Sequence, residues 1–205
     1  KFSSFQNLTA KRQLHFPQVP VLKLSLFCKC LIHLLLQLQP LVHFGMTNIC
    51  FYFVQGKQLL IFYQPQIDIA SGKLVGAEAL VRWHHQQHGL MEPVRFIPVA
   101  EETGFITALD TWVLNTACRQ LRVWRDQGWK LPRLSINLSS KQVEQRNLIS
   151  QIEGLLTQNG LEPSSLELEI TESILMRKTV QAMRSIKDLR ELGVQLAVDD
   201  FGTGY

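Results

Sequence analysis

The strongest constraint on the fold is a regular alternation of strand-like and helix-like segments in the last third of the chain. Strand patterns occupy residues 133–139 (RLSINLS), 166–171 (LELEIT) and 194–200 (VQLAVDD). Residues 148–158 and 179–192 lie between them, carry a helical apolar period and are each followed by a glycine within two positions. A β-α-β-α-β order with short loops predicts parallel strands joined by right-handed crossovers.

The preceding stretch begins with a hairpin and continues with helices. Residues 59–83 predict two strands joined by a turn at 70–73, where Ser and Gly interrupt two β-rich runs. Pro93 opens a short helix over 93–102, and residues 107–127 follow a helical period that includes two tryptophans. Together with the alternation, these segments predict an α/β fold.

Polar side chains stand near the ends of the three later strands. Asn137, Glu169 and Asp199 are separated by 32 and 30 residues, which is one βα unit each, and Glu78 lies in an earlier strand. Since the carboxyl ends of parallel strands face one rim, and that rim holds the site in such folds, these four side chains are expected to converge.

The chemistry of this set indicates a metal site. Three carboxylates and one amide, without a converging Cys or His, suit Mg²⁺, Mn²⁺ or Ca²⁺ better than zinc. Asp200, next to Asp199, adds a carboxylate, and adjacent acids can hold two ions. Two ions on one rim are the usual arrangement for in-line phosphodiester hydrolysis. Arg82, four residues beyond Glu78, is placed to contact a substrate phosphate.

Two points stay open at this level. Glu167 and Glu169 alternate onto the same face of their strand, so geometry does not choose between them as ligands. His84, His85 and His88 are clustered but lack a ligand spacing, and structural or solvent-facing roles are expected for them.

Composition argues against a nucleic-acid polymer as partner. The net charge of +4 comes from residues 1–67, which hold six Lys or Arg and no acid. Residues 68–205 hold fifteen basic and seventeen acidic residues, or 15 − 17 = −2. The part with the candidate site is therefore not a basic surface. Four cysteines without a zinc spacing predict reduced thiols and a cytoplasmic location.

Residues 1–54 do not match the rest. They are apolar but interrupted by polar residues, and no window reaches the length of uninterrupted apolar sequence that a membrane-spanning helix needs. A membrane-associating tail, an unusual extension, and translation from a wrong frame or damaged gene remain as interpretations, the last slightly favoured. The first residue is Lys1 rather than Met, which fits a fragment.

Five strings in order resemble the EAL domain family. They are YQPQ at 63–66, Glu78-Ala79-Leu80 followed by Val-Arg-Trp, NLS at 137–139, ELEITES at 167–173 and DDFGTGY at 199–205. This family comprises bacterial phosphodiesterases that linearise cyclic di-GMP on a modified TIM (β/α)8 barrel. The resemblance covers roughly residues 55–205. One departure is Gln86, where the family commonly has proline.

The resemblance implies roles for particular residues. The first-metal ligands would be Glu78, Asn137, Glu169 and Asp199. Asp199 would bridge to a second ion that Asp200 also holds, the cofactor being Mg²⁺ or Mn²⁺. Glu172 is similar to the glutamate that braces the DDFGTGY loop, which the family uses in substrate binding and dimerisation. Gln64 and Arg82 match positions that contact cyclic di-GMP.

The same resemblance implies an incomplete domain. A barrel of this kind needs about 250 residues, so 55–205 corresponds to the first half to two-thirds of an EAL domain. The family's lysine that positions the attacking water, a later glutamate and a late glutamine have no counterpart before Tyr205. The chain alone is expected to be inactive as an enzyme. A non-catalytic cyclic di-GMP-binding module and a non-functional truncated product are the alternatives, although the intact motifs argue against ordinary degeneracy.

Removing residues 1–54 should leave the fold of the remainder unchanged, because this segment carries no motif and no apolar period that complements the rest. The measurement is a comparison of circular dichroism spectra and thermal transitions of the two chains. A shortened chain that no longer folds, where the 205-residue chain does, would contradict the expectation.

Overall fold

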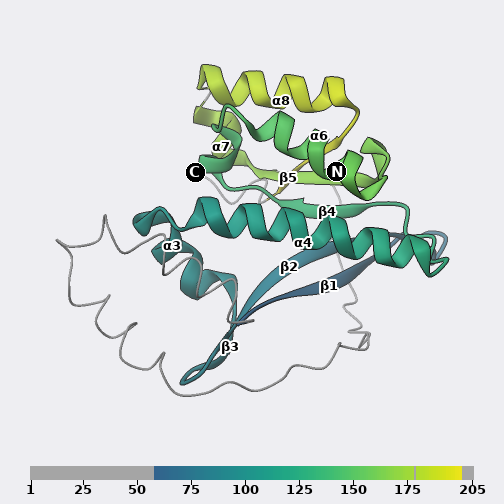
Figure 1. Ribbon diagram of the computed structural model, residues 1–205, viewed down its shortest axis with the longest axis horizontal. Coiled ribbons are helices and arrows are strands. Elements are labelled where there is room, and N and C mark those ends of the chain that lie inside the picture. Colours follow the sequence, from purple (N-terminus) through teal and green to yellow (C-terminus); the bar gives the residue numbers. More distant parts are fainter. Residues whose placement is uncertain (1–57, 178, 200–205) are drawn as a thin grey trace, which may run out of the picture.

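The computed structural model describes residues 58–177 and 179–199 (Figure 1). The expectations for residues 1–54 and for Asp200 lie outside these residues. The strands are β1 (Leu59–Ile67), β2 (Leu74–His85), β3 (Gly89–Met91), β4 (Leu134–Asn137), β5 (Leu166–Thr171) and β6 (Gln195–Asp199). The helices are α3 (Pro93–Thr103), α4 (Ile106–Asp126), α5 (Ser140–Val143), α6 (Leu148–Asn159), the 3-10 turn η1 (Pro163–Ser165), α7 (Glu172–Arg177) and α8 (Val180–Leu192).

The strands form one mixed sheet in the order β1-β2-β4-β5-β6, with β3 paired to β2. β1 and β2 are antiparallel, whereas β2, β4, β5 and β6 are parallel to one another. The predicted α/β class and the parallel pairing of the later strands are confirmed. Four short elements, β3, α5, η1 and α7, were not predicted. The three helical ones span at most six residues, which is too short to show a helical period, and β3 has only three residues.

The predicted turn of the first hairpin is held by one side chain. The Oδ1 atom of Asp68 accepts hydrogen bonds from the backbone N–H and the hydroxyl of Ser71, at 2.8 and 2.5 Å. Gly72 follows with φ 66°, a conformation that costs glycine little. The turn sets the register that places Gln64 opposite Glu78.

The hydrophobic core lies between the sheet and a layer of helices, in which α4, α6 and α8 lie side by side (Figure 1). Fully buried side chains from strands and helices meet there, among them Leu114, Leu121, Leu134, Ile136, Leu148, Ile152, Leu168 and Leu189. The apolar stripe expected on residues 107–127 packs as predicted, with Trp112 and Trp124 at the margin of the core.

The apolar stripe expected on residues 179–192 is only partly right. Leu189 is fully buried, but Val180 and Met183 are 87% and 47% exposed. The residues that turn inward beside Leu189 are Ala182 and Ser185, each 2% exposed. Small side chains let α8 approach the layer below closely, and a search for large apolar residues overlooks them.

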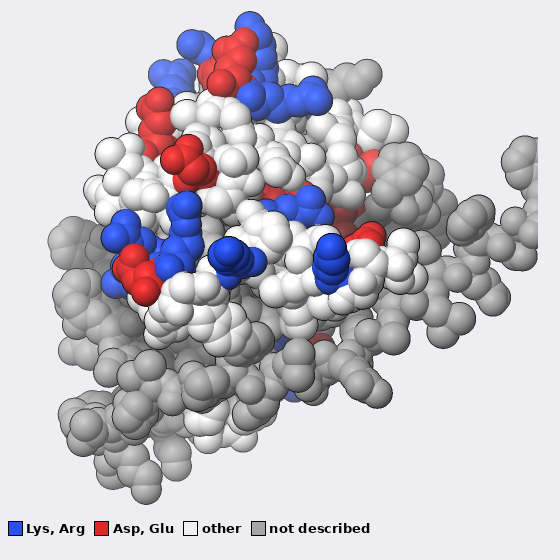
Figure 2. Space-filling view, turned by 90° about the vertical axis from the view of Figure 1, so that its right-hand side faces the viewer, with Lys and Arg blue, Asp and Glu red and all other residues white. Residues whose placement is uncertain are grey.

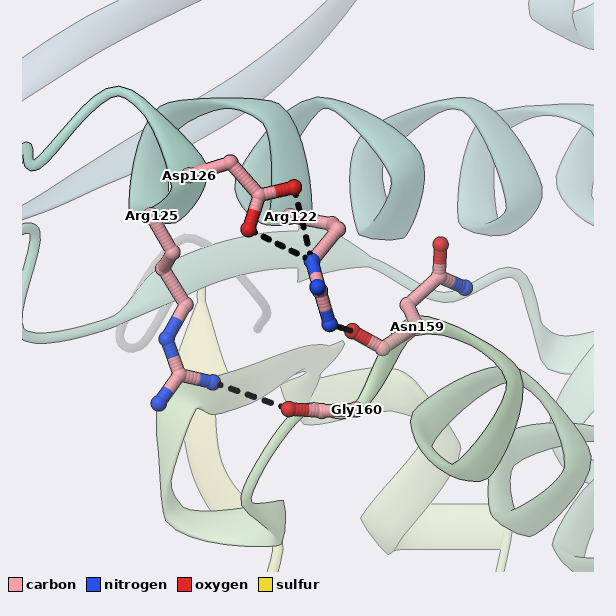
Figure 3. A network of polar contacts seen from close by, with 5 residues as sticks. All are labelled: Arg122, Arg125, Asp126, Asn159 and Gly160. Atoms are coloured by element: carbon pink, nitrogen blue, oxygen red, sulfur yellow. Dashed lines mark hydrogen bonds and ion pairs between the residues drawn. The ribbon is translucent and has the colours of Figure 1, made fainter.

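The end of α6 is tied to α4 by two arginines (Figure 3). Arg122 donates to the carbonyl oxygen of Asn159 at 3.1 Å, and Arg125 donates to that of Gly160 at 3.3 Å. Asp126 holds the Arg122 guanidinium, with Nε 2.8 Å from Oδ1. Cations at a helix C-terminus satisfy carbonyls that have no partner within the helix. These exposed contacts orient α6 against α4.

Gly76 allows β2 to lie close to its neighbours. A Cβ atom at this position would lie 2.6 Å from Gln66 Oε1 and 3.2 Å from the backbone oxygen of Arg133. Backbone cannot yield as a flexible side chain does, so this position needs the smallest residue. Gly154, inside α6, has nothing within 4 Å of the same added atom.

The substitutions Gly76→Ala and Gly154→Ala should therefore have opposite effects. Overpacking should lower the free energy of unfolding of Gly76→Ala by about 1–3 kcal/mol. Gly154→Ala should raise it by about 0.5–1 kcal/mol, because alanine is the better helix former. Urea titration of both variants measures this. Equal changes in the two variants would show that the close approach at Gly76 is not limiting.

Candidate functional site

The predicted site residues share the sheet face that points away from the helices. Strand alternation turns Ala79, Ile136 and Leu168 into the helix-covered core, where they are 4%, 0% and 0% exposed. The neighbouring positions Glu78, Asn137 and Glu169 consequently lie on the opposite face. The sequence pattern predicted that these residues converge at one rim of the sheet, and it did not predict which face they share.

Two of the predicted residues are in direct contact. The Asn137 amide nitrogen donates to Glu78 Oε1 at 3.0 Å, bridging β4 and β2. Asn137 is opposite Glu169 in the β4–β5 register, and Asp199 is opposite Thr171 in the β5–β6 register. The strands thus bring Glu78, Asn137 and Glu169 together, with Asp199 two positions further along the sheet.

Glu169 lies at the electrostatic centre of this group. Burial raises its pKa to about 7, and the negative charges of Glu78 and then Asp199 add to the effect. Within the described residues no Lys or Arg forms an ion pair with Glu169. A carboxyl crowded by like charges binds a proton or a cation readily.

Glu167, the open alternative, has different surroundings. It accepts a hydrogen bond from Ser135 at 2.6 Å and lies 3.4 Å from the guanidinium of Arg133. Gln66 donates to the same Ser135 hydroxyl at 3.3 Å, and Arg133 donates to Gln195 at 3.4 Å. Glu167 is 8% exposed and already pairs with a cation. It therefore belongs to a polar network with Gln66, Arg133, Ser135 and Gln195, which is called the polar floor of the site below.

The remaining predicted residues lie around this group. Gln64 is paired with Glu78 across the first hairpin. Arg82 lies on β2 four residues beyond Glu78, with its guanidinium carbon 5.9 Å from the centre of the Phe62 ring. Glu172 is the first residue of α7, directly after β5. Asp200 lies outside the described residues, as does the loop that Glu172 is predicted to brace.

A divalent cation fits the donor chemistry of this face. The side chains offer carboxylate and amide oxygens, which hard cations prefer. A cation would also offset the charges of Glu78 and Asp199, which together with burial raise the Glu169 pKa. In the described part of the chain, no three His, Cys, Asp or Glu side chains are already grouped to hold a metal. Asn137 is not one of these residue types, and Asp200 lies outside the described residues.

The histidine cluster is structural at its centre. The His85 ring is 6% exposed, and its Nδ1 atom accepts hydrogen bonds from the backbone N–H groups of Gln87 and His88 at 3.1 and 3.2 Å. The ring packs edge-on against Trp83 at 4.8 Å. Burial and the charge of His88 lower the pKa of His85, which agrees with a neutral ring that accepts hydrogen bonds.

Sequence reasoning did not single out Asp110 or the polar floor. Asp110 lies on the buried side of α4, is 8% exposed and accepts a hydrogen bond from Ser139 at 2.5 Å. The available signal was an acidic residue directly after Leu109 on an apolar stripe. Glu167 was considered as an alternative ligand, but its pairing with Ser135 and Arg133 was not predicted.

The outer surface mixes charges of both signs. Figure 2 shows Lys and Arg interspersed with Asp and Glu on one face of the molecule. Along α8, Arg184 pairs with Asp188 at 3.7 Å and Lys187 with Glu191 at 3.5 Å. Among the described helices, none has the length and apolarity needed to cross a membrane.

Comparison with known proteins agrees with the resemblance that the five sequence strings indicated. A sequence model of the EAL domain matches residues 51–205. The bifunctional diguanylate cyclase/cyclic di-GMP phosphodiesterase MucR of Pseudomonas aeruginosa is 42% identical over 152 residues, covering 74% of this chain and 22% of MucR. The cyclic di-GMP phosphodiesterase NbdA of the same species is 44% identical over 148 residues, covering 72% of this chain and 19% of NbdA.

Comparison of the fold with solved structures also finds a phosphodiesterase of this kind. A solved structure of the PaMucR phosphodiesterase in a c-di-GMP complex superposes with a TM-score of 0.70 at 40% identity, covering 78% of this chain and 64% of that one. The chain thus spans about a fifth of the length of these two curated relatives.

The burial of Glu169 and the negative charges beside it predict that the stability of the chain depends on pH in metal-free buffer. Its pKa is raised from the ordinary 4.5 to about 7, so the folded chain holds this proton more tightly than the unfolded chain. The stability that it contributes is full below pH 4.5 and is lost as the pH rises through 7. Asp110, whose pKa burial also raises to about 7, contributes in the same direction.

Glu169→Gln should therefore reduce the fall in unfolding free energy between pH 4.5 and 7.5, leaving the share of Asp110. Urea titrations at several pH values, with EDTA present, measure the slope. Glu153→Gln, on the exposed side of α6, is the control and should keep the wild-type slope. An unchanged slope in Glu169→Gln would contradict the assignment.

Proposed function

The chain belongs to the EAL domain family, and from that premise we propose that it is the part of a cyclic di-GMP phosphodiesterase that carries the first-metal residues. The proposed reaction is hydrolysis of one phosphodiester bond of cyclic di-GMP to give the linear dinucleotide. The observation that carries it is the set Glu78, Asn137 and Glu169 on one sheet face, with Asp199 beside them.

Phosphodiesterases of this family depend on metal ions. We propose Mg²⁺ or Mn²⁺ held by Glu78, Asn137, Glu169 and Asp199, with a second ion held by Asp200 and shared with Asp199. The bound ions would polarise the phosphodiester and supply an activated water for in-line attack. The raised pKa of Glu169 supports this assignment, because a bound cation would offset the burial of this carboxyl and its repulsion by Glu78 and Asp199.

The protein's own side chains would bind and orient the dinucleotide. Gln64 lies opposite Glu78 on β1 and Arg82 lies beyond it on β2, so both border the proposed metal set from one side. Arg82 suits a phosphate through its paired N–H donors. Its guanidinium also lies near the exposed Phe62 ring, 36% accessible, which offers an apolar surface beside it.

A binding module without cleavage is the second candidate. It would need only the residues that border the site and are proposed to contact the dinucleotide, Gln64 and Arg82, and no metal ion. The two candidates share the dinucleotide and differ in turnover. We propose that a protein holding this domain acts in the cytoplasm, where cyclic di-GMP signalling takes place, and that it assembles as a homodimer.

Glu78→Ala should abolish both metal-dependent binding and turnover of cyclic di-GMP. Binding is measured by calorimetry on the 205-residue chain, and hydrolysis by product chromatography with Mg²⁺ on the chain and on the full-length product of its gene. A loss of about 100-fold or more in rate is expected where turnover occurs, as for removal of a metal ligand.

Glu153→Ala, an exposed glutamate on α6, is the matched control and should behave as wild type. Binding without turnover by the full-length product would select the non-catalytic module. Absence of binding by both the chain and the full-length product would show that the proposed function is wrong.

A further inference from the structure

The turn that follows β4 is fixed on both sides. On one side, the backbone N–H of Leu138 donates to the carbonyl oxygen of Glu169 on β5 at 2.8 Å. On the other side, the hydroxyl of Ser139 donates to Oδ2 of Asp110 on α4 at 2.5 Å. Leu138 itself is 3% exposed and anchored in the core. Asn137, immediately before this turn, is therefore held between a strand and a helix.

Ser139 has a second function in the same turn. Its side chain is the N-cap of α5 and accepts a hydrogen bond from the backbone N–H of Gln142 at 3.2 Å. Since α5 is only four residues long, its cap determines where the chain leaves β4. Lys141 also donates to the backbone oxygen of Glu101, which ties α5 to α3.

Asp110 is an unusual residue for its position. It lies on the core side of α4, next to Leu109 and Leu114, and is 8% exposed. A buried carboxyl is costly unless it is hydrogen-bonded. Among the described residues, the hydrogen bond made to its side chain comes from Ser139. Burial raises its pKa to about 7, which makes a neutral side chain acceptable at this position.

We propose that Asp110 and Ser139 form a positioning pair that holds the Asn137 amide toward Glu78. The pair acts through the β4–α5 turn and touches neither Glu78 nor Glu169. Its effect on the Asn137 amide is independent of what the site binds. Its effect on metal affinity rests on the proposed function.

The first test observes the Asn137 side chain directly. Asparagine-selective ¹⁵N labelling of the 205-residue chain gives an NMR signal from each side-chain amide, and Asn137→Asp identifies the one from Asn137. Ser139→Ala should shift this signal toward the position of a freely rotating amide. Ser165→Ala is the matched control, because it removes a hydroxyl that is 9% exposed and donates to Glu162 at the opposite end of β5.

The second test measures Mn²⁺ affinity in a double-mutant cycle. Ser139→Ala should weaken Mn²⁺ binding about 10-fold, as substitutions behind a metal ligand commonly do. In an Asn137→Ala background, Ser139→Ala should cause no further loss, since the pair acts through that residue. Asp110→Ala should resemble Ser139→Ala, whereas Asp110→Asn keeps an oxygen acceptor for the Ser139 hydroxyl and should stay within about twofold of wild type.

The outcomes separate positioning from plain stabilisation. If Ser139→Ala lowers the melting temperature but leaves the Asn137 amide signal and Mn²⁺ affinity unchanged, the proposal is wrong. Additive losses in the cycle would also overturn it. If wild type binds no Mn²⁺, the proposed function fails while the amide signal still decides on positioning. Should Asp110→Ala not fold, Ser139→Ala and Asp110→Asn carry the test.

Discussion

Parallel pairing of β2, β4, β5 and β6 is the constraint on which the rest of the structure depends. In paired strands, every second side chain faces the same way, so the register decides for each residue whether it meets the helices or the open face. Ile136 and Asn137 are neighbours in sequence, yet one is completely buried in the core and the other contacts Glu78. A slip of one residue would exchange these two roles along the strand.

Three acidic residues, two on β5 and one on α4, have their burial compensated in three different ways. Glu167 has an arginine and a hydroxyl donor. Asp110 has a hydroxyl donor and a raised pKa. Glu169 has a raised pKa and acidic neighbours. The first two carboxyls each receive a hydrogen bond from a serine hydroxyl, and Glu167 also has a cation. The third leaves negative charge concentrated on the face where Asn137 and Glu78 meet.

The sequence was sufficient to predict the parallel α/β core and the placement of Asn137, Glu169 and Asp199 at successive strand ends, because strand length and helical period are local properties. It could not distinguish Glu169 from Glu167, since both point to the same face. That difference depends on Arg133, which reaches Glu167 from the start of β4. Nor could it place Ala182 and Ser185 in the core, because small residues give no apolar signal and are buried only by the way α8 packs.

The contrast between Glu167 and Glu169 bears on where a ligand cation would bind. The two residues are on one strand and one face, two positions apart, yet their neighbours differ. Near Glu167 the chain supplies a cation of its own, and the carboxylate needs no other. Near Glu169 the described residues supply Glu78 and Asp199 instead, both of the same charge.

A fold stabilised only by its internal contacts gains nothing from such crowding, since like charges at short range lower stability. The arrangement is understandable if a divalent cation from solution binds beside Glu169, as the Arg133 guanidinium lies beside Glu167. This reasoning supports the proposed metal set without depending on any motif in the sequence.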